Sequence, residues 1–84
     1  MEKTIILIMV GKRRESAVQV QKILTDFGCS IKTRLGIHDG VLDRCSEQGF
    51  LMIEFVGDSN EKTGIMEELK KVDNVSAELV TLKL

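Results

Sequence analysis

With 84 residues, the chain suits one small domain, which buries only about 60 to 65% of the surface that its unfolded form exposes. Its 12 lysines and arginines nearly balance its 13 aspartates and glutamates, which excludes a global field that favours nucleic acids or acidic membranes. The two cysteines do not have Cys-x-x-Cys spacing and the sequence shows no secretory signal, which together indicate reduced thiols. The apolar run at 5–10 ends too soon for a signal peptide or a membrane span. We expect a single domain over residues 1–84 that is soluble and cytoplasmic.

The first half of the chain has the pattern of a strand, a helix and a second strand. Residues 4–10 form an uninterrupted apolar run ended by Gly11, which suits a strand covered on both faces. Apolar side chains then recur three and four residues apart, which predicts a helix over 14–27. Residues 31–38 alternate between apolar and polar side chains, as in a half-exposed strand at the edge of a sheet.

The second half repeats this order. Residues 50–56 predict a strand, with Leu51, Ile53 and Phe55 on one face. Asp58, Ser59 and Asn60 offer N-cap oxygens to a helix over 60–71. A last strand is expected over 75–83, and its apolar phase slips from one face to the other along its length. Such a slip indicates either a bulge or a strand that leaves the sheet for a partner.

This order of elements predicts an α+β fold of the ferredoxin-like βαββαβ type. Its four-stranded antiparallel sheet carries both helices on one face and has the first and third strands in the centre. If the helices cover Ile5, Leu7, Met9, Leu51, Ile53 and Phe55, the other face bears an apolar patch with Glu54 in it: Ile6, Ile8, Val10, Phe50, Met52 and Val56. A bare apolar patch usually marks an interface. We therefore expect a homo-oligomer, a dimer or a tetramer, that assembles through the sheet, with Arg34 paired to Glu54 on this face.

The same topology occurs in RNA-recognition modules, and Gly49–Phe55 partly follows their aromatic signature. A stacking platform needs aromatic rings on the open face, but Ile6 and Met52 occupy two of those places and Glu54 repels phosphate. We expect no direct binding of nucleic acid and no binding to membranes.

Two polar clusters are candidate sites. Gly11, Lys12 and Arg13 precede a helix N-terminus, where free backbone amides and cations favour an anion, although a solvated turn explains them more simply. The second cluster offers nitrogen, oxygen and sulfur to zinc or nickel from His38, Asp39, Asp43 and Cys45. Its spacing matches no metal motif, and we favour a polar loop around the turn at Asp39.

Catalysis has little support in the sequence, and no cofactor is indicated. Cys29 follows the first helix, and Cys45 has no histidine at a spacing that would activate it as a nucleophile. We therefore expect a protein that is not an enzyme.

Residues 34–37 (Arg-Leu-Gly-Ile), preceded by an amphipathic helix that ends in Lys-Ile-Leu-Thr-Asp-Phe-Gly at 22–28, resemble the small proteins described as regulators of the iron-only hydrogenase system. That family is ACT-like and is similar to the regulatory domain of the nickel-responsive repressor. The resemblance covers nearly the whole chain. It implies a ferredoxin-like domain that assembles through its sheet, is associated with regulating hydrogenase expression or maturation, and has no established catalysis.

The resemblance does not extend to DNA binding or nickel sensing, because no ribbon-helix-helix segment precedes Thr4 and His38 is the single histidine. ACT-like domains often hold a small effector near the turn after the first strand, at a subunit interface. Gly11 matches that turn by position, and Arg34 and Gly36 belong to the resembling segment. We therefore expect a non-catalytic regulatory module that oligomerises and binds a small-molecule effector or a metal at its interfaces, with a ligand-free scaffolding subunit as the alternative.

Overall fold

Two strand–helix–strand units follow one another along the chain and share one sheet. The computed structural model describes residues 1–11, 14–38 and 49–84. Within these ranges the elements are β1 (Glu2–Val10), α1 (Arg14–Asp26), a short 3-10 helix η1 (Gly28–Ser30), β2 (Ile31–His38), β3 (Gly49–Phe55), α2 (Ser59–Lys70) and β4 (Val75–Lys83). Apart from η1, which was not expected, every element begins and ends within two residues of its predicted bounds.

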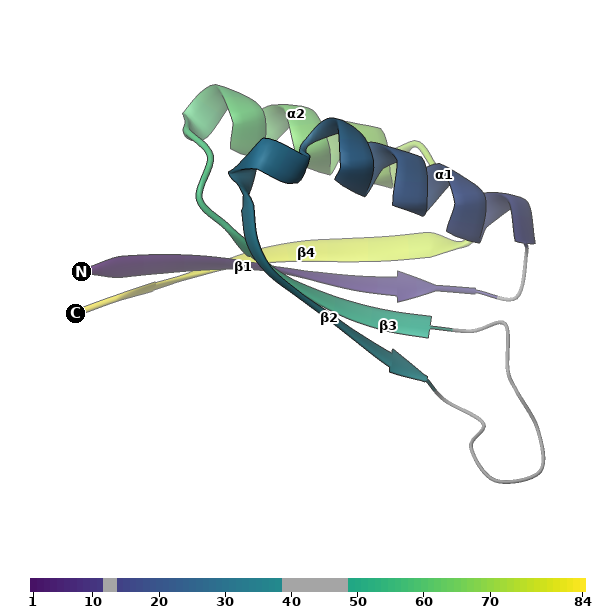
Figure 1. Ribbon diagram of the computed structural model, residues 1–84, viewed down its shortest axis with the longest axis horizontal. Coiled ribbons are helices and arrows are strands. Elements are labelled where there is room, and N and C mark those ends of the chain that lie inside the picture. Colours follow the sequence, from purple (N-terminus) through teal and green to yellow (C-terminus); the bar gives the residue numbers. More distant parts are fainter. Residues whose placement is uncertain (12–13, 39–48) are drawn as a thin grey trace.

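The four strands lie in the order β2-β3-β1-β4, and each neighbouring pair is antiparallel. Both helices lie on one face of the sheet, and the other face is left open (Figure 1). The ferredoxin-like α+β fold is therefore confirmed, with β1 and β3 in the centre and β2 and β4 at the edges. No helix in the described ranges is long and apolar enough to cross a membrane.

The core lies between the helix layer and the inner face of the sheet. It combines alternate residues of the strands with one stripe of each helix, because strand side chains alternate between faces and helical ones recur every three to four positions. Its members are at most 7% exposed: Ile6, Ile8, Val10, Val20, Leu24, Ile53, Phe55, Ile65, Leu69 and Ala77. Full burial of one large aliphatic side chain contributes about 1.5–3 kcal/mol, so this cluster is the main source of stability.

The predicted inner face of β1 was wrong. We expected Ile6, Ile8 and Val10 on the open face, at a subunit interface, but all three lie in the core, at most 6% exposed. The strand is apolar on both sides, so its alternation does not show which side faces inward. Pairing with β3 decides the direction, because Ile6 lies opposite the buried Ile53 and opposite residues of an antiparallel pair share a face.

The strand β4 stays in the sheet along its whole length. Its register with β1 is unbroken from Val10 opposite Val75 to Glu2 opposite Lys83, so neither a bulge nor a departure from the sheet causes the slip in apolar phase. The slip arises because the strand is apolar on different faces in its two halves. Val75, Ala77 and Leu79 pack toward the helices, whereas Val80 and Leu82 point to the open face.

The helix α2 begins with a cap at Asp58, the first of the three residues that were predicted to offer N-cap oxygens. Glu61 N donates to Asp58 Oδ1 at 2.9 Å, and Asp58 N donates to Glu61 Oε1 at 3.3 Å, which completes a capping box. Such a cap satisfies backbone donors that the first helical turn leaves free and is worth about 1 kcal/mol. The cap thus fixes the residue at which α2 begins.

Beyond the end of β3, β1 and β4 continue as a two-stranded tip. Pairing of β1 with β3 starts at Thr4, whereas pairing with β4 extends to Glu2. The two chain ends lie side by side at this tip (Figure 1), where Leu84 N donates to Met1 O at 2.9 Å. The described part of the molecule therefore has its termini at one end and the open edges of β2 and β4 along its sides.

Candidate functional site

The face of the sheet away from the helices carries a continuous set of apolar side chains, which we call the open-face patch. The strand registers identify its members, because side chains opposite one another on neighbouring strands share a face. They are Ile5, Leu7, Met9, Leu35, Phe50, Met52, Val80 and Leu82. Three of them are more than half exposed: Met9 (60%), Leu35 (51%) and Leu82 (63%).

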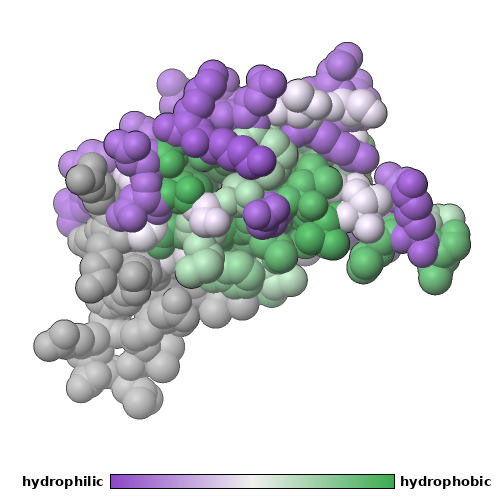
Figure 2. Space-filling view, turned by 180° about the vertical axis from the view of Figure 1, so that it is seen from behind, coloured by the Kyte–Doolittle hydropathy of each residue, from purple (hydrophilic) through white to green (hydrophobic). Residues whose placement is uncertain are grey.

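The patch contrasts with the helix layer on the opposite side of the core. Seen from behind, hydrophilic side chains cover the helices, and apolar side chains gather below them (Figure 2). Phe50, Met52 and Glu54 lie on the open face as the sequence predicted, and Ile5, Leu7 and Met9 take the places expected for their even-numbered neighbours. An apolar surface of this extent is typical of an interaction site.

An ion pair borders the open-face patch at one end. Lys3 Nζ donates to Glu54 Oε2 at 3.1 Å, and Thr33 Oγ1 donates to Glu54 Oε1 at 3.4 Å. The hydrogen bond from Lys3 is the main cause that holds the pKa of Glu54 below its ordinary value of 4.5. Glu54 therefore remains charged at neutral pH although its side chain is only 18% exposed.

The expected pairing of Arg34 with Glu54 was wrong. The register between β2 and β3 shifts between Ile31 and Thr33, which places Thr33 opposite Glu54 and Arg34 opposite Ile53. Arg34 therefore lies on the helix side, where Nη2 donates to Gln21 Oε1 of α1. One inserted residue moves every following side chain to the other face, and a regular alternation in the sequence does not reveal the insertion.

Gly11, the first candidate for effector binding, packs closely against the turn between α2 and β4. Its N–H donates to Asn74 O at 2.8 Å, and a Cβ at Gly11 would lie 2.4 Å from Asn74 Nδ2. Ser16 Oγ of α1 also donates to Asp73 O of this turn, at 2.6 Å. These contacts explain the glycine at position 11 by close packing, without a ligand.

Of the candidate ligand-binding residues that the structure describes, Gly11 and Gly36 lie apart. Gly36 lies on β2, which β3 separates from β1 and hence from Gly11, so the strands are roughly 10 Å apart. A Cβ at Gly36 would lie 3.3 Å from Leu51 Cδ2, which indicates packing within the sheet. Lys12 and Arg13, predicted beside Gly11, lie outside the described residues.

The candidate metal ligands also fall outside the described part of the chain. This holds for Asp39, Asp43 and Cys45, and for the side chain of His38, whose backbone ends β2. Within the ranges that the structure describes, no group of three histidine, cysteine, aspartate or glutamate side chains is placed to hold a metal ion. Cys29 is a free, exposed thiol.

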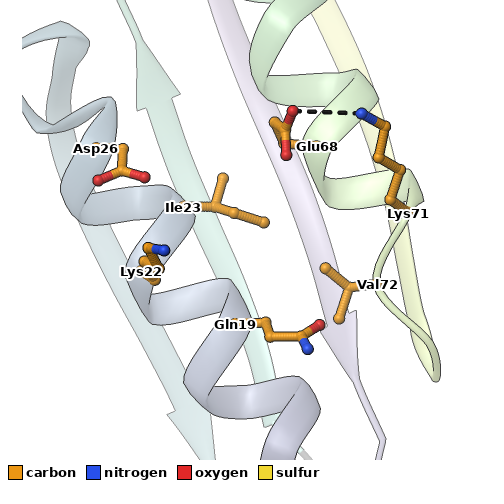
Figure 3. A pocket seen from close by; sticks show the side chains of 7 residues that line it. All are labelled: Gln19, Lys22, Ile23, Asp26, Glu68, Lys71 and Val72. Carbon is orange, nitrogen blue, oxygen red and sulfur yellow. Dashed lines mark hydrogen bonds and ion pairs between the residues drawn. The ribbon is translucent and has the colours of Figure 1, made fainter.

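A groove between the two helices was not predicted from the sequence. It has a volume of about 230 Å³ and is lined by Gln19, Lys22, Ile23, Asp26, Glu68, Lys71 and Val72. Ile23 and Val72 form its apolar floor, and charged side chains of both signs stand around it, with Glu68 bonded to Lys71 (Figure 3). The groove depends on how α1 and α2 pack together, a tertiary feature that helical periodicity within each segment does not contain.

Several solved structures have the same fold as this chain. The chain superposes on an uncharacterized protein from Thermotoga maritima with a TM-score of 0.85, at 20% identity over 99% of this chain and 100% of that one. The ACT domain of the GTP pyrophosphokinase of Chlorobium tepidum matches with a TM-score of 0.66, at 18% identity over 95% and 97% of the two chains. The apo form of CPII from Thiomonas intermedia, a nitrogen regulatory PII-like protein, matches with a TM-score of 0.62, at 8% identity over 100% and 92%.

The chain is thus an ACT-like, ferredoxin-like domain. No protein-family model matches it, and no curated protein is significantly similar to it in sequence. Identities of this size establish the fold alone, and one fold serves many functions.

Proposed function

We propose that this protein is a non-catalytic regulatory module that self-associates through the open face of its sheet and binds a small effector or a metal at the subunit interfaces. The observation that carries the proposal is the open-face patch. In a single chain, Met9, Leu35 and Leu82 would remain more than half exposed to water. Burying such side chains between two copies removes apolar surface from water and stabilises the assembly.

The shape of the molecule supports a role in binding more than one in catalysis. The groove between α1 and α2 is open to solvent, with charged side chains of both signs and no serine, threonine or cysteine among its lining residues. An ACT domain and a nitrogen regulatory PII-like protein share the fold. By analogy of fold alone, this favours regulation by a small molecule.

The narrower proposal is a regulator of the iron-only hydrogenase system. It is supported by the resemblance of residues 34–37 and of the helix end that precedes them. Genes for hydrogenase maturation next to the gene for this protein would support this assignment. A change of hydrogenase activity after deletion of the gene would support it directly, and unchanged activity would count against it.

A ligand-free scaffolding subunit is the second candidate function. The contact of Gly11 with Asn74 favours it, because the space beside the turn where an effector was expected is filled by the Asn74 side chain. A thermal-shift screen with amino acids, nucleotides and divalent metals separates the two functions. A ligand that binds the folded state alone raises its melting temperature, whereas no shift at millimolar concentrations favours the scaffold.

Light scattering at tens of micromolar protein tests self-association. We expect a mass above that of one chain for the wild type and a smaller mass for Met52→Asp, because the substitution places an unpaired carboxylate in the centre of the open-face patch. Val18→Asp is the matched control, since Val18 is also an exposed apolar residue, at 62%, but lies on α1. A wild type with the mass of one chain, or a Met52→Asp protein with unchanged mass, would refute the proposal.

A further inference from the structure

The open-face patch contains two of the four methionines of the chain, Met9 and Met52. In the register of the central strands β1 and β3, Met9 lies opposite Phe50, and Met52 is two residues further along β3 on the same face. Such diagonal neighbours are about 7–8 Å apart, within reach of long side chains. The two thioethers therefore form one pair, which we call the methionine pair, in a patch whose other side chains are hydrocarbons.

Both members of the methionine pair are accessible from the open face, and Met9 is the more exposed. It is 60% exposed, and its partner on β4 is Ser76, an exposed residue with a small side chain. Met52 is partly exposed and lies between Leu7 and Leu35, its partners on the two neighbouring strands. Oxidation requires contact between the sulfur and the reagent, so a single chain presents both thioethers, Met9 more than Met52.

A peroxide converts a thioether of this kind to a sulfoxide. The sulfur lone pair attacks one oxygen of hydrogen peroxide, an S–O bond forms, the O–O bond breaks, and the second oxygen leaves as water after proton transfer. The sulfur loses two electrons and the peroxide gains them. The side chain thereby changes from a flexible apolar group to a polar one with an acceptor oxygen.

We propose that the methionine pair is an oxidation site that controls self-association, because conversion of Met9 and Met52 to sulfoxides prevents two copies from joining through the open face. This inference rests on the proposed function, in which the open-face patch is buried between two copies. A sulfoxide oxygen without a donor is an unpaired polar group, and burying one is unfavourable. The members of the patch have apolar side chains, and Lys3 at its border already donates to Glu54.

The two methionines have different parts in this control. Ser76, opposite Met9, offers a hydroxyl donor to a sulfoxide at that position, whereas Met52 has leucines on both sides. Met9 therefore reacts first, and the sulfoxide of Met52 weakens the contact more. A contact between two copies buries two Met52 side chains, and each unpaired oxygen costs about tenfold in affinity.

The site acts on the dissociated chain, because association covers the open face. A chain that is oxidised while free does not rejoin, so peroxide shifts the population toward the free form. Oxidation of Met9 should therefore slow as protein concentration rises. In the Met52→Asp protein, where the face contact is removed, its rate should not depend on concentration. Methionine sulfoxide reductases, one for each sulfoxide epimer, reverse the change, with a pair of thiols as reductant.

Peroxide treatment followed by light scattering tests the inference. The parent protein for this experiment carries Cys29→Ser and Cys45→Ser, so that no thiol reacts, and mass spectrometry of peptides locates the sulfoxides. We expect the treated parent to have the mass of the Met52→Asp protein, with the dissociation constant of the face contact raised by about a hundredfold or more. Treatment with the two reductases should restore the original mass.

Leucine variants supply the controls, because leucine is close to methionine in volume and is not oxidised. A parent with Met9→Leu and Met52→Leu should keep its mass in peroxide, and Met52→Leu alone should remove most of the effect. Met66→Leu should leave the parent sensitive, since Met66 of α2 packs against the core on the helix side.

Two results would overturn the oxidation site and leave the face contact standing. One is a parent protein that keeps its mass after both open-face sulfoxides have formed. The other is a Met9→Leu, Met52→Leu protein that loses mass in peroxide as the parent does. An untreated parent with the same mass as the Met52→Asp protein would instead refute the face contact, and the oxidation site with it.

Discussion

Gly11→Ala should destabilise the protein by a packing clash at the turn between α2 and β4. The new Cβ would lie 2.4 Å from Asn74 Nδ2 and 2.5 Å from Asn74 Cγ, roughly 1 Å inside ordinary contact distance, and overpacking of this kind costs about 1–3 kcal/mol. The backbone bond from Gly11 N to Asn74 O, at 2.8 Å, keeps the two residues close together. Relief of the clash therefore requires the Asn74 side chain to turn away from Gly11.

Asn74→Gly provides the matched second variant. Asn74 has a φ of 63°, a left-handed conformation that glycine adopts readily, so this substitution removes the obstructing side chain without backbone strain. We expect the double variant Gly11→Ala with Asn74→Gly to recover most of the lost stability, with a coupling free energy of about 0.5–3 kcal/mol.

Urea unfolding measures these free energies. Far-UV circular dichroism is the suitable probe, because the chain has no tryptophan or tyrosine, and all variants need the same protein concentration because an oligomer's stability depends on it. If Gly11→Ala is as stable as the wild type, or if Asn74→Gly restores nothing, the packing explanation of Gly11 is wrong. Loss of an effector's thermal shift in a stable Gly11→Ala protein would instead support a ligand site at this turn.

Two further predictions follow from the faces of the sheet. In the Met52→Asp background, Ile8→Ala should lower the free energy of unfolding by about 2–5 kcal/mol, whereas Met9→Ala should change it by about 0.5 kcal/mol or less. Urea unfolding measures both values. Equal losses would contradict the corrected direction of β1. The pKa of Glu54 is lowered in the folded state, so its ion pair with Lys3 stabilises the fold above about pH 4.5 and this contribution is lost as pH falls through the folded-state pKa. Between neutral and acidic pH, the melting temperature of the wild type should therefore fall more than that of Glu54→Gln, and parallel pH profiles would refute this.

Local patterns were sufficient to predict the elements and their order. Alternation over Ile31–His38, the helical spacing of Val20 and Leu24, and the cap at Asp58 each depend on residues within a few positions of one another. Such short-range signals are written directly into a sequence. The topology followed from them because few arrangements of two strand–helix–strand units bury both helices on one sheet.

The direction of β1 could have been inferred from charge. Glu54 was predicted to lie on the open face, and a carboxylate that an interface buries there needs a cation. Lys3 has the same parity as Ile5, Leu7 and Met9, so pairing it with Glu54 would have turned these residues outward. Hydrophobic alternation alone carried no such information, because both faces of the strand are apolar.

The surroundings of Gly11 and Arg34 could not be predicted in this way. Asn74 meets Gly11 from the far end of the chain, and the irregularity near Ile31 that turns Arg34 toward Gln21 is a matter of register between strands. Both features depend on tertiary packing, for which the spacing of residue types within a segment holds no signal.

The adjacent chain ends make the fold suited to closure into a ring. Met1 and Leu84, which adjoin the outer ends of β1 and β4, are already joined by a backbone hydrogen bond of 2.9 Å. A peptide linker of a few residues between them would therefore leave the sheet undisturbed. Such a cyclic chain has fewer unfolded conformations, which by the chain-entropy relation used for cross-links of this length would stabilise it by up to about 4–5 kcal/mol.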